Sequence, residues 1–291
     1  MAPLLALLAV LSESAAAAAS RAIYFEGGPS IRDGRWALAD DGFAARELAR
    51  YVSLTTGAYP VVVDAAESPA ALAEAAARGA HEAIVIAAPG SALLAAATSL
   101  VAVEPRSEVL GAAASMDASA EAGQHAIRKL TAASGATVTL IVGAGEFGRL
   151  YGAYTAAEQL GVRFELTGDI LPDPTQQGGL PLAGVAELPL AHTDASPAFD
   201  YRGLQPFHDF PEGPDWWDTE HYKLILTQLS KMKMNFLGLH TYPYSATDAG
   251  HSTGHNEPTV FVGTADDLEA DGSVKVASAY PTSYANTMRV R

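Results

Sequence analysis

A β-α-β step between residues 201 and 244 most constrains the fold of this chain. The segment predicts a strand from Tyr201, a loop rich in polar and aromatic side chains, an amphipathic helix and a second strand ending at His240. Hydrogen-bonding side chains gather where both strands end, which in a β/α barrel is the substrate-binding face. Fewer than fifty residues follow Tyr244. The sequence therefore predicts only the first units of a barrel.

The preceding part of the chain, residues 22–170, predicts an α+β domain in which helices cover a mixed sheet. Strands are expected at 22–25, 59–63, 83–87, 125–130, 137–142 and 162–165, with helices beginning near residues 41, 69, 91 and 146. Residues 104–122 have little pattern and are expected to form a loop. The segment 171–198 is rich in proline and contains a Gly-Gly pair, so it predicts a linker between two domains.

A glycine motif follows the strand at 137–142. The residues Gly143-Ala144-Gly145-Glu146-Phe147-Gly148 open a helix, and Glu165 lies about twenty positions further on. This pattern is typical of a dinucleotide fingerprint, in which glycines bring the backbone close to a pyrophosphate. A doubly wound domain needs further β-α units, however, and a proline-rich segment follows instead. A tight strand-to-helix turn is therefore the favoured interpretation, with the helix packed on the sheet through Leu150, Tyr154, Ala157 and Leu160.

Composition excludes several classes of partner. The net charge is −15, and the 18 Lys and Arg residues are scattered, so neither a nucleic acid nor an anionic membrane surface is expected to bind. Hydrophobic residues make up 49% of the chain, which is typical of a globular protein. The chain has no cysteine, so disulfides are impossible.

The N-terminus predicts a secretory signal peptide over residues 1–21. An apolar run from Pro3 to Leu11 is too short to span a bilayer, and Ala15 to Ala19 offer an A-x-A cleavage pattern. No Lys or Arg precedes Arg21, so an Ala-rich leader without a targeting role is the alternative. A signal peptide predicts a secreted protein or one in the endomembrane lumen. No other segment reaches transmembrane length.

Two further stretches carry a resemblance to a known class of enzymes. Residues 148–164, GRLYGAYTAAEQLGVRF, and residues 54–60, LTTGAYP, resemble the accessory domain that precedes the barrel in family 20 β-hexosaminidases and related α-glucuronidases. Residues 201–204, YRGL, are similar to the first barrel strand of family 20, whose Arg holds sugar hydroxyls. Residues 231–240, KMKMNFLGLH, are similar to the following helix end and second strand.

The chain also departs from this family. Gly238 stands where the family has its first His, and Thr241-Tyr242-Pro243 replaces Leu-Thr-Asp. The resemblance therefore implies a distant relative, with an accessory domain at 22–170 (domain 2 of the β-hexosaminidase type) and the beginning of a (β/α)8 TIM barrel at 199–291. The family's catalytic acid pair sits on a later barrel strand, beyond Arg291.

The candidate substrate-binding residues are polar or aromatic and lie near the two predicted barrel strands. For each residue type a structural role is the alternative to substrate binding. Arg202 either holds vicinal hydroxyls of a sugar or pairs with a nearby aspartate. A strand-end histidine either contacts substrate or belongs to the core, and an indole either stacks on a sugar or covers the barrel. The set is Arg202, His208, Asp209, Trp216, His240 and Tyr242. Four residues of the intervening helix are expected to face the core: Leu224, Leu226, Leu229 and Met232.

These observations predict a glycoside hydrolase-like protein that acts on a poly- or oligosaccharide and, in its full-length form, hydrolyses O-glycosyl bonds. The alternative is a non-catalytic carbohydrate-binding or interaction module, with a dinucleotide-binding domain a more distant option. His251 and His255 form an H-x-x-x-H in a loop-like segment without a third ligand, so no metal is expected. No cofactor is implied.

Overall fold

The chain divides into two compact units in the computed structural model. The first unit comprises residues up to Asp200 together with Lys231–Lys233, and the second comprises the remainder. The described residues are 21–27, 31–32, 35–36, 41–68, 70–77, 82–101, 103–116, 123–173, 180–206, 217–238 and 270.

A six-stranded mixed sheet forms the centre of the first unit, which confirms the predicted mixed α/β architecture. The strand order is β10-β6-β7-β5-β1-β4; β7, β5, β1 and β4 are parallel, and β6 is antiparallel to both neighbours. The two most central parallel strands, β5 and β7, are buried along their length because continuous apolar runs suit a sheet covered on both faces. The bounds are β1 Arg21–Phe25, β4 Val61–Asp64, β5 Glu82–Ala87, β6 His125–Thr131, β7 Thr137–Gly143 and β10 Thr193–Ala195.

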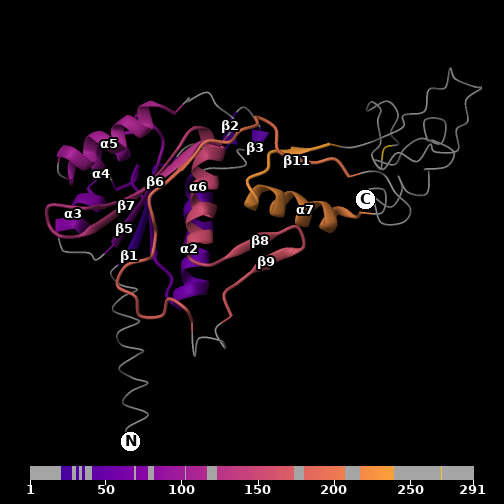
Figure 1. Cartoon of the computed structure of the whole chain (residues 1–291), viewed down its shortest axis with the longest axis horizontal. Helices are drawn as coiled ribbons and strands as arrows, with labels where there is room; N and C mark the ends of the chain where they lie inside the picture. The colour runs from indigo at the N-terminus through magenta and orange to yellow at the C-terminus, as the bar shows by residue number, and fades with distance from the viewer. Residues whose placement is uncertain are drawn as a thin grey trace, which may run out of the picture. The chain divides into compact units, whose positions relative to one another are not determined.

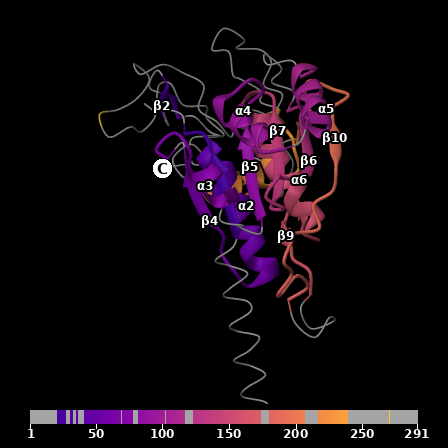
Figure 2. The same ribbon diagram turned by 90° about the vertical axis from the view of Figure 1, so that its left-hand side faces the viewer.

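Helices cover both faces of this sheet (Figure 1). Helices α2 (Asp41–Thr56) and α6 (Gly145–Gln159) lie on one face, where Leu48, Tyr51 and Tyr154 join the odd-numbered apolar residues of β1 and β7 in one core cluster. Figure 2 looks onto the opposite layer, formed by α3 (Ala71–Ala77), α4 (Ala92–Ser99) and α5 (Val103–Ala114). The sheet thus separates two apolar cores.

The expectation of a loop at residues 104–122 is wrong for its first half, because α5 occupies Val103–Ala114. Its apolar stripe is short and consists of Val109 and Ala113, both buried against the sheet. Pro105 lies in the first turn, where a helix has no intrahelical N–H bond to lose. The hydrophobic periodicity of this segment is too weak to predict a helix, because its apolar stripe has only two residues and the segment contains a proline and a mid-helix glycine.

The remaining strands are short. Antiparallel hairpins are formed by β2 (Ile31–Arg32) with β3 (Arg35–Trp36) and by β8 (Arg163–Glu165) with β9 (Gly168–Ile170). Part of the segment expected as a linker belongs to the first unit, since Thr193–Ala195 is the edge strand β10 and Leu188 is fully buried. Among the helices in the described part of the chain, none has the length and apolar character of a membrane span.

The second unit contains β11 (Gly203–Leu204), β12 (Phe236–Leu237) and α7 (Thr219–Lys231) except for its last residue, Lys231, which belongs to the first unit. The expectation that Leu224 and Leu226 face the core is wrong, because their side chains are 44% and 51% exposed, whereas Leu229 is buried. Ile225 and Leu229, four residues apart, lie on the more buried side of α7. Leu224 and Leu226 lie on other faces of the helix, so the presence of leucines alone did not identify the packed face.

Candidate functional site

The predicted β-α-β step is confirmed in the second unit. Strands β11 and β12 are parallel neighbours, with Gly203 opposite Phe236 and Leu204 opposite Leu237. Backbone bonds fix this pairing: the Arg202 carbonyl accepts from Asn235 N at 2.8 Å and from Phe236 N at 3.0 Å, and Gly238 N donates to the Leu204 carbonyl at 2.8 Å. Both strands therefore end on the same side, where the candidate site is expected.

Arg202 lies immediately before β11, at the amino end of the strand. Its backbone N–H donates to the Asn235 side-chain oxygen at 2.9 Å, so an amide side chain supports the strand entry. The Arg202 side chain is half-buried. The other five candidate residues, His208, Asp209, Trp216, His240 and Tyr242, lie outside the described residues. The structure therefore places Arg202 alone among the candidate set.

Gly238 follows β12 at the carboxyl end of the step, at the position where the sequence departs from the family 20 pattern. A Cβ at this position would lie 2.9 Å from Gln205 Cγ and 3.1 Å from Gln205 Cβ. Any larger side chain would have to displace Gln205, which follows β11. Gln205 therefore occupies the space that a histidine side chain at residue 238 would need.

The glycine motif of the first unit brings β7, α6 and β6 into close contact. A Cβ on Gly143 would lie 2.2 Å from the Gly148 carbonyl carbon, and a Cβ on Gly148 would lie 2.4 Å from the Gln124 carbonyl oxygen. Gly145 has a φ of 59°, in the region that disfavours other residues. The predicted packing of α6 is confirmed, since Leu150, Tyr154, Ala157 and Leu160 are all buried in the core.

The loop formed by this motif is occupied by an arginine of α6. Arg149 pairs with the Asp41 carboxylate and donates to the Gly145 carbonyl at 2.7 Å. The antiparallel strand β6 also reaches the loop, because Ala144 N donates to the Gln124 carbonyl at 2.9 Å. Pyrophosphate recognition relies on backbone N–H groups facing a ligand. The contacts seen at this loop favour the tight-turn interpretation of the motif.

His125, the first residue of β6, is a buried titratable group that is only 3% exposed. Its Nδ1 lies 3.0 Å from the Gly123 carbonyl, and its Nε2 lies 2.8 Å from the Thr155 hydroxyl. Burial lowers the pKa of His125 to about 4, with the charge of Lys233 acting in the same direction and the Gly123 bond opposing it. A neutral histidine with both nitrogens bonded joins β6 to α6, and this arrangement favours a structural role.

Asp169 is the centre of a second polar cluster in the first unit. Its carboxylate accepts from the Tyr51 hydroxyl at 2.8 Å and pairs with Lys231 Nζ at 2.9 Å. Burial and the Asp169 hydrogen bond raise the pKa of Tyr51, so this phenol stays protonated. Each polar group named here has a close partner, which suits a structural network.

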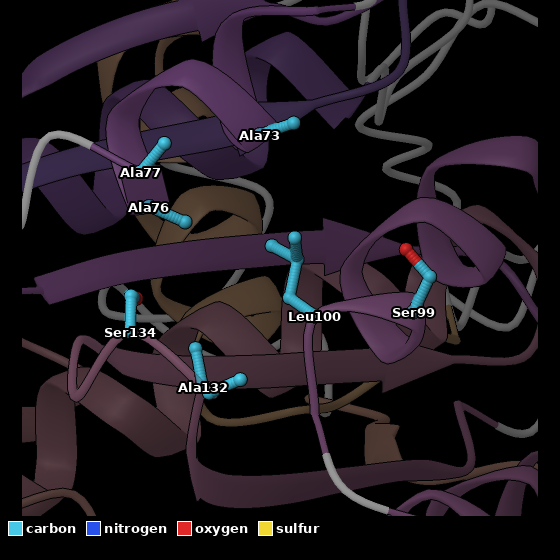
Figure 3. Close-up of a pocket in the computed structure, with 8 residues that line it drawn as sticks. Ala73, Ala76, Ala77, Ser99, Leu100, Ala132 and Ser134 are labelled. Carbon is cyan, nitrogen blue, oxygen red and sulfur yellow. The ribbon is translucent and has the colours of Figure 1, made fainter.

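A shallow apolar pocket of about 290 Å³ lies on the α3–α4 side of the first unit (Figure 3). It is formed by α3, the end of α4 and the turn between β6 and β7. Its lining contains no titratable side chain and consists of Ala73, Ala76, Ala77, Ser99, Leu100, Ala132, Ala133 and Ser134. In open α/β sheets ligands bind beyond the carboxyl ends of the strands, whereas Ala132–Ser134 precede the amino end of β7. The pocket offers no acid-base or nucleophilic chemistry.

Metal binding finds no support among the residues that the structure describes, where no group of three or more His, Asp or Glu side chains is placed to hold one ion. The H-x-x-x-H residues His251 and His255 lie outside that part of the chain.

Comparison with known proteins gives one kind of similarity. No protein-family profile matches the chain, and no curated protein matches it in sequence. Among solved structures it is similar to a family GH115 4-O-methyl-α-glucuronidase with specificity for decorated arabinogalactans, at a TM-score of 0.40 and 12% identity. The similarity covers 75% of this chain and 25% of the enzyme, so the chain spans a quarter of that enzyme's length.

Proposed function

We propose that this chain is part of a glycoside hydrolase-like protein that acts on a poly- or oligosaccharide. The observation that carries the proposal is the parallel pairing of β11 and β12 on either side of α7. A parallel pair with a helical crossover is the repeating step of a β/α barrel. In this proposal the first unit is the accessory domain and the second begins the barrel, as the YRGL and KMKMNFLGLH motifs imply.

The proposed site lies beyond the carboxyl ends of β11 and β12. His208, Asp209 and Trp216 follow the first strand in sequence, and His240 and Tyr242 follow the second. Imidazole, carboxylate and phenol groups bind sugar hydroxyls, and an indole stacks on the apolar face of a pyranose. Arg202 precedes β11, at the opposite end of that strand, and only the family motif assigns it to the same substrate. The general acid and base would come from barrel strands that follow this chain, in a protein secreted or retained in the endomembrane lumen.

Binding to a panel of neutral and acidic oligosaccharides, measured by calorimetry, tests this function. We expect the chain to bind at least one oligosaccharide, and His240→Ala and Tyr242→Phe to weaken that binding by tenfold or more. Arg163→Met is a control for unspecific loss of binding, because Arg163 is an exposed residue of β8 in the first unit, away from the proposed site in the sequence.

Three results would count against the proposal: no affinity for any saccharide, equal losses in the control and the site variants, or micromolar binding of NAD or FAD in place of a sugar. Binding without any effect on hydrolysis by the longer protein would favour the non-catalytic module.

A further inference from the structure

The two edge strands of the six-stranded sheet, β10 and β4, lie on opposite sides of Figure 2 and differ in character. β10 has three residues and carries Asp194, whose side chain is 73% exposed. β4 has three consecutive valines before Asp64, and Val61 is 55% exposed. Natural proteins protect sheet edges with short strands, charged side chains or proline. The edge at β10 has the first two of these protections, whereas β4 presents an apolar edge with Pro60 at one end.

The backbone groups of β4 face β1 and the outer side of the sheet in alternation. Ala65 N donates to the Phe25 carbonyl at 2.8 Å, in continuation of the parallel pairing of the two strands. This bond fixes the alternation, so the backbone groups of Val61 and Val63 face β1 and those of Val62 face outward. Among the strands that the structure describes, none pairs with the outer side of β4. The N–H and the carbonyl of Val62 are therefore available to one more strand.

We propose that this strand is β4 of a second copy of the chain, paired antiparallel about a twofold axis at Val62. The two Val62 residues then exchange both of their backbone hydrogen bonds. In the next outward-facing pair Pro60 lies opposite Asp64. Pro60 has no N–H to donate, and the Asp64 carbonyl already accepts from Ser68 N at 3.1 Å. The bond that the proline cannot make is therefore one that Asp64 does not need, so the strand is matched to itself.

The same alignment brings apolar side chains together on both faces of the sheet. Val62 packs against the core cluster beneath α2 and α6, and Val63 packs against the cluster beneath α3 and α4. Val61 shares the face of Val63 because side chains alternate along a strand. The exposed Val61 thus lies opposite the partner's Val63, and the two Val62 side chains meet on the other face. Opposed Cβ atoms in antiparallel strands are about 4.5 to 5.5 Å apart, close enough for valines to touch.

The charge pattern allows two acidic copies to approach at this edge. The chain has a net charge of −15, so two copies repel each other unless they meet where each is uncharged. Residues 51–63 contain no charged side chain. The Asp64 carboxylate accepts from Gly27 N and Ala66 N, both at 2.9 Å, and in this alignment it does not lie opposite its own copy. Because β4 has only four residues, the interface is small and the dimer is expected to be weak and reversible.

Sedimentation velocity of the full chain at about 1 to 500 μM measures this association. We expect an equilibrium between monomer and dimer in this range. Val61→Asp should raise the dissociation constant by about tenfold or more, because it places a carboxylate among the paired valines. Ile170→Asp is the matched control and should dimerise as wild type, since Ile170 is a β-branched strand residue of β9 that is 46% exposed. Circular dichroism verifies that both variants are folded.

Amide hydrogen exchange of wild type locates the contact without any substitution. The Val62 N–H should become protected as the protein concentration rises, whereas the N–H groups of Val61 and Val63, which bond to β1, should be protected at every concentration. A chain that stays monomeric over the whole range overturns the proposal, as does a dimer in which exchange at Val62 does not change. A dimer that Val61→Asp and Ile170→Asp leave equally intact overturns it too, because the contact would then lie on another surface.

Discussion

Protonation of His125 is expected to destabilise the first unit as the pH falls from 6.5 towards 4. The pKa of this buried histidine is lowered to about 4 from its usual 6.5. Between these two values the unfolded chain binds a proton that the folded chain does not. Stability therefore rises with pH across this window, is fully present above the unfolded pKa and is lost as the pH falls through the window. The sign is that of a histidine buried in its neutral form.

The size of this effect follows from the difference in pKa. For a single group with these two pKa values, the free energy of unfolding falls by about 2.5 kcal/mol between pH 8 and pH 4.5. The loss is large because the imidazole is only 3% exposed, so its charged form loses most of its hydration in the folded chain. This is a substantial part of the roughly 5 to 15 kcal/mol that stabilises a typical domain.

Urea unfolding of wild type and His125→Gln, followed by circular dichroism from pH 8 to pH 4.5, measures this contribution. Other carboxylates titrate in both proteins, so the difference between the two stability curves isolates residue 125. The variant is expected to be less stable at pH 8 and to lose about 2.5 kcal/mol less on acidification. Parallel curves for the two proteins would refute the assignment of a neutral, buried histidine.

Three further predictions concern packing, a buried charge and catalysis. Gly148→Ala places a Cβ 2.4 Å from the Gln124 carbonyl and should cost about 1 to 3 kcal/mol in urea unfolding, whereas Gly111→Ala, which meets open space in α5, should be neutral or stabilising. Arg21→Met leaves Glu82 without its buried partner and should cost about 3 to 5 kcal/mol by the same measurement, and a loss below 1 kcal/mol would contradict the burial of this pair. The chain alone should not hydrolyse aryl glycosides; turnover above background that disappears in Asp209→Asn would place a catalytic carboxyl within it.

The elements that sequence reasoning predicts well are those whose signal lies within the element itself. The apolar runs at 83–87 and 137–142 are buried strands, and the stripe of Leu150 and Tyr154 faces the core of α6. The edge strand β10 has no such signal. Thr193 and Asp194 acquire their place from Arg128 of β6, which binds the Thr193 carbonyl at 3.0 Å and the Asp194 carboxylate at 2.6 Å.

The candidate site likewise has some features that the local sequence predicts and others that depend on residues distant in the chain. The order strand, helix, strand was predictable because the alternation of patterns is local. The role of Asn235 was not, because its bond to Arg202 joins residues 33 positions apart and exists only once β11 and β12 are in register. The exposure of Leu224 and Leu226 was not predictable either, because the elements that pack against α7 decide which of its faces is buried, and the sequence of the helix does not specify those elements.

Gly203 limits how β11 and β12 can align. A Cβ at this residue would lie 1.7 Å from the Phe236 carbonyl oxygen, closer than any two such atoms can approach. A slip of one residue would bring the Cβ of Arg202 or Leu204 to this point and would also turn every side chain to the opposite face. The observed register is free of this clash, whereas a shift by one residue in either direction is sterically blocked. The register of β11 and β12 is therefore selected by the exclusion of its alternatives more than by attraction between the strands.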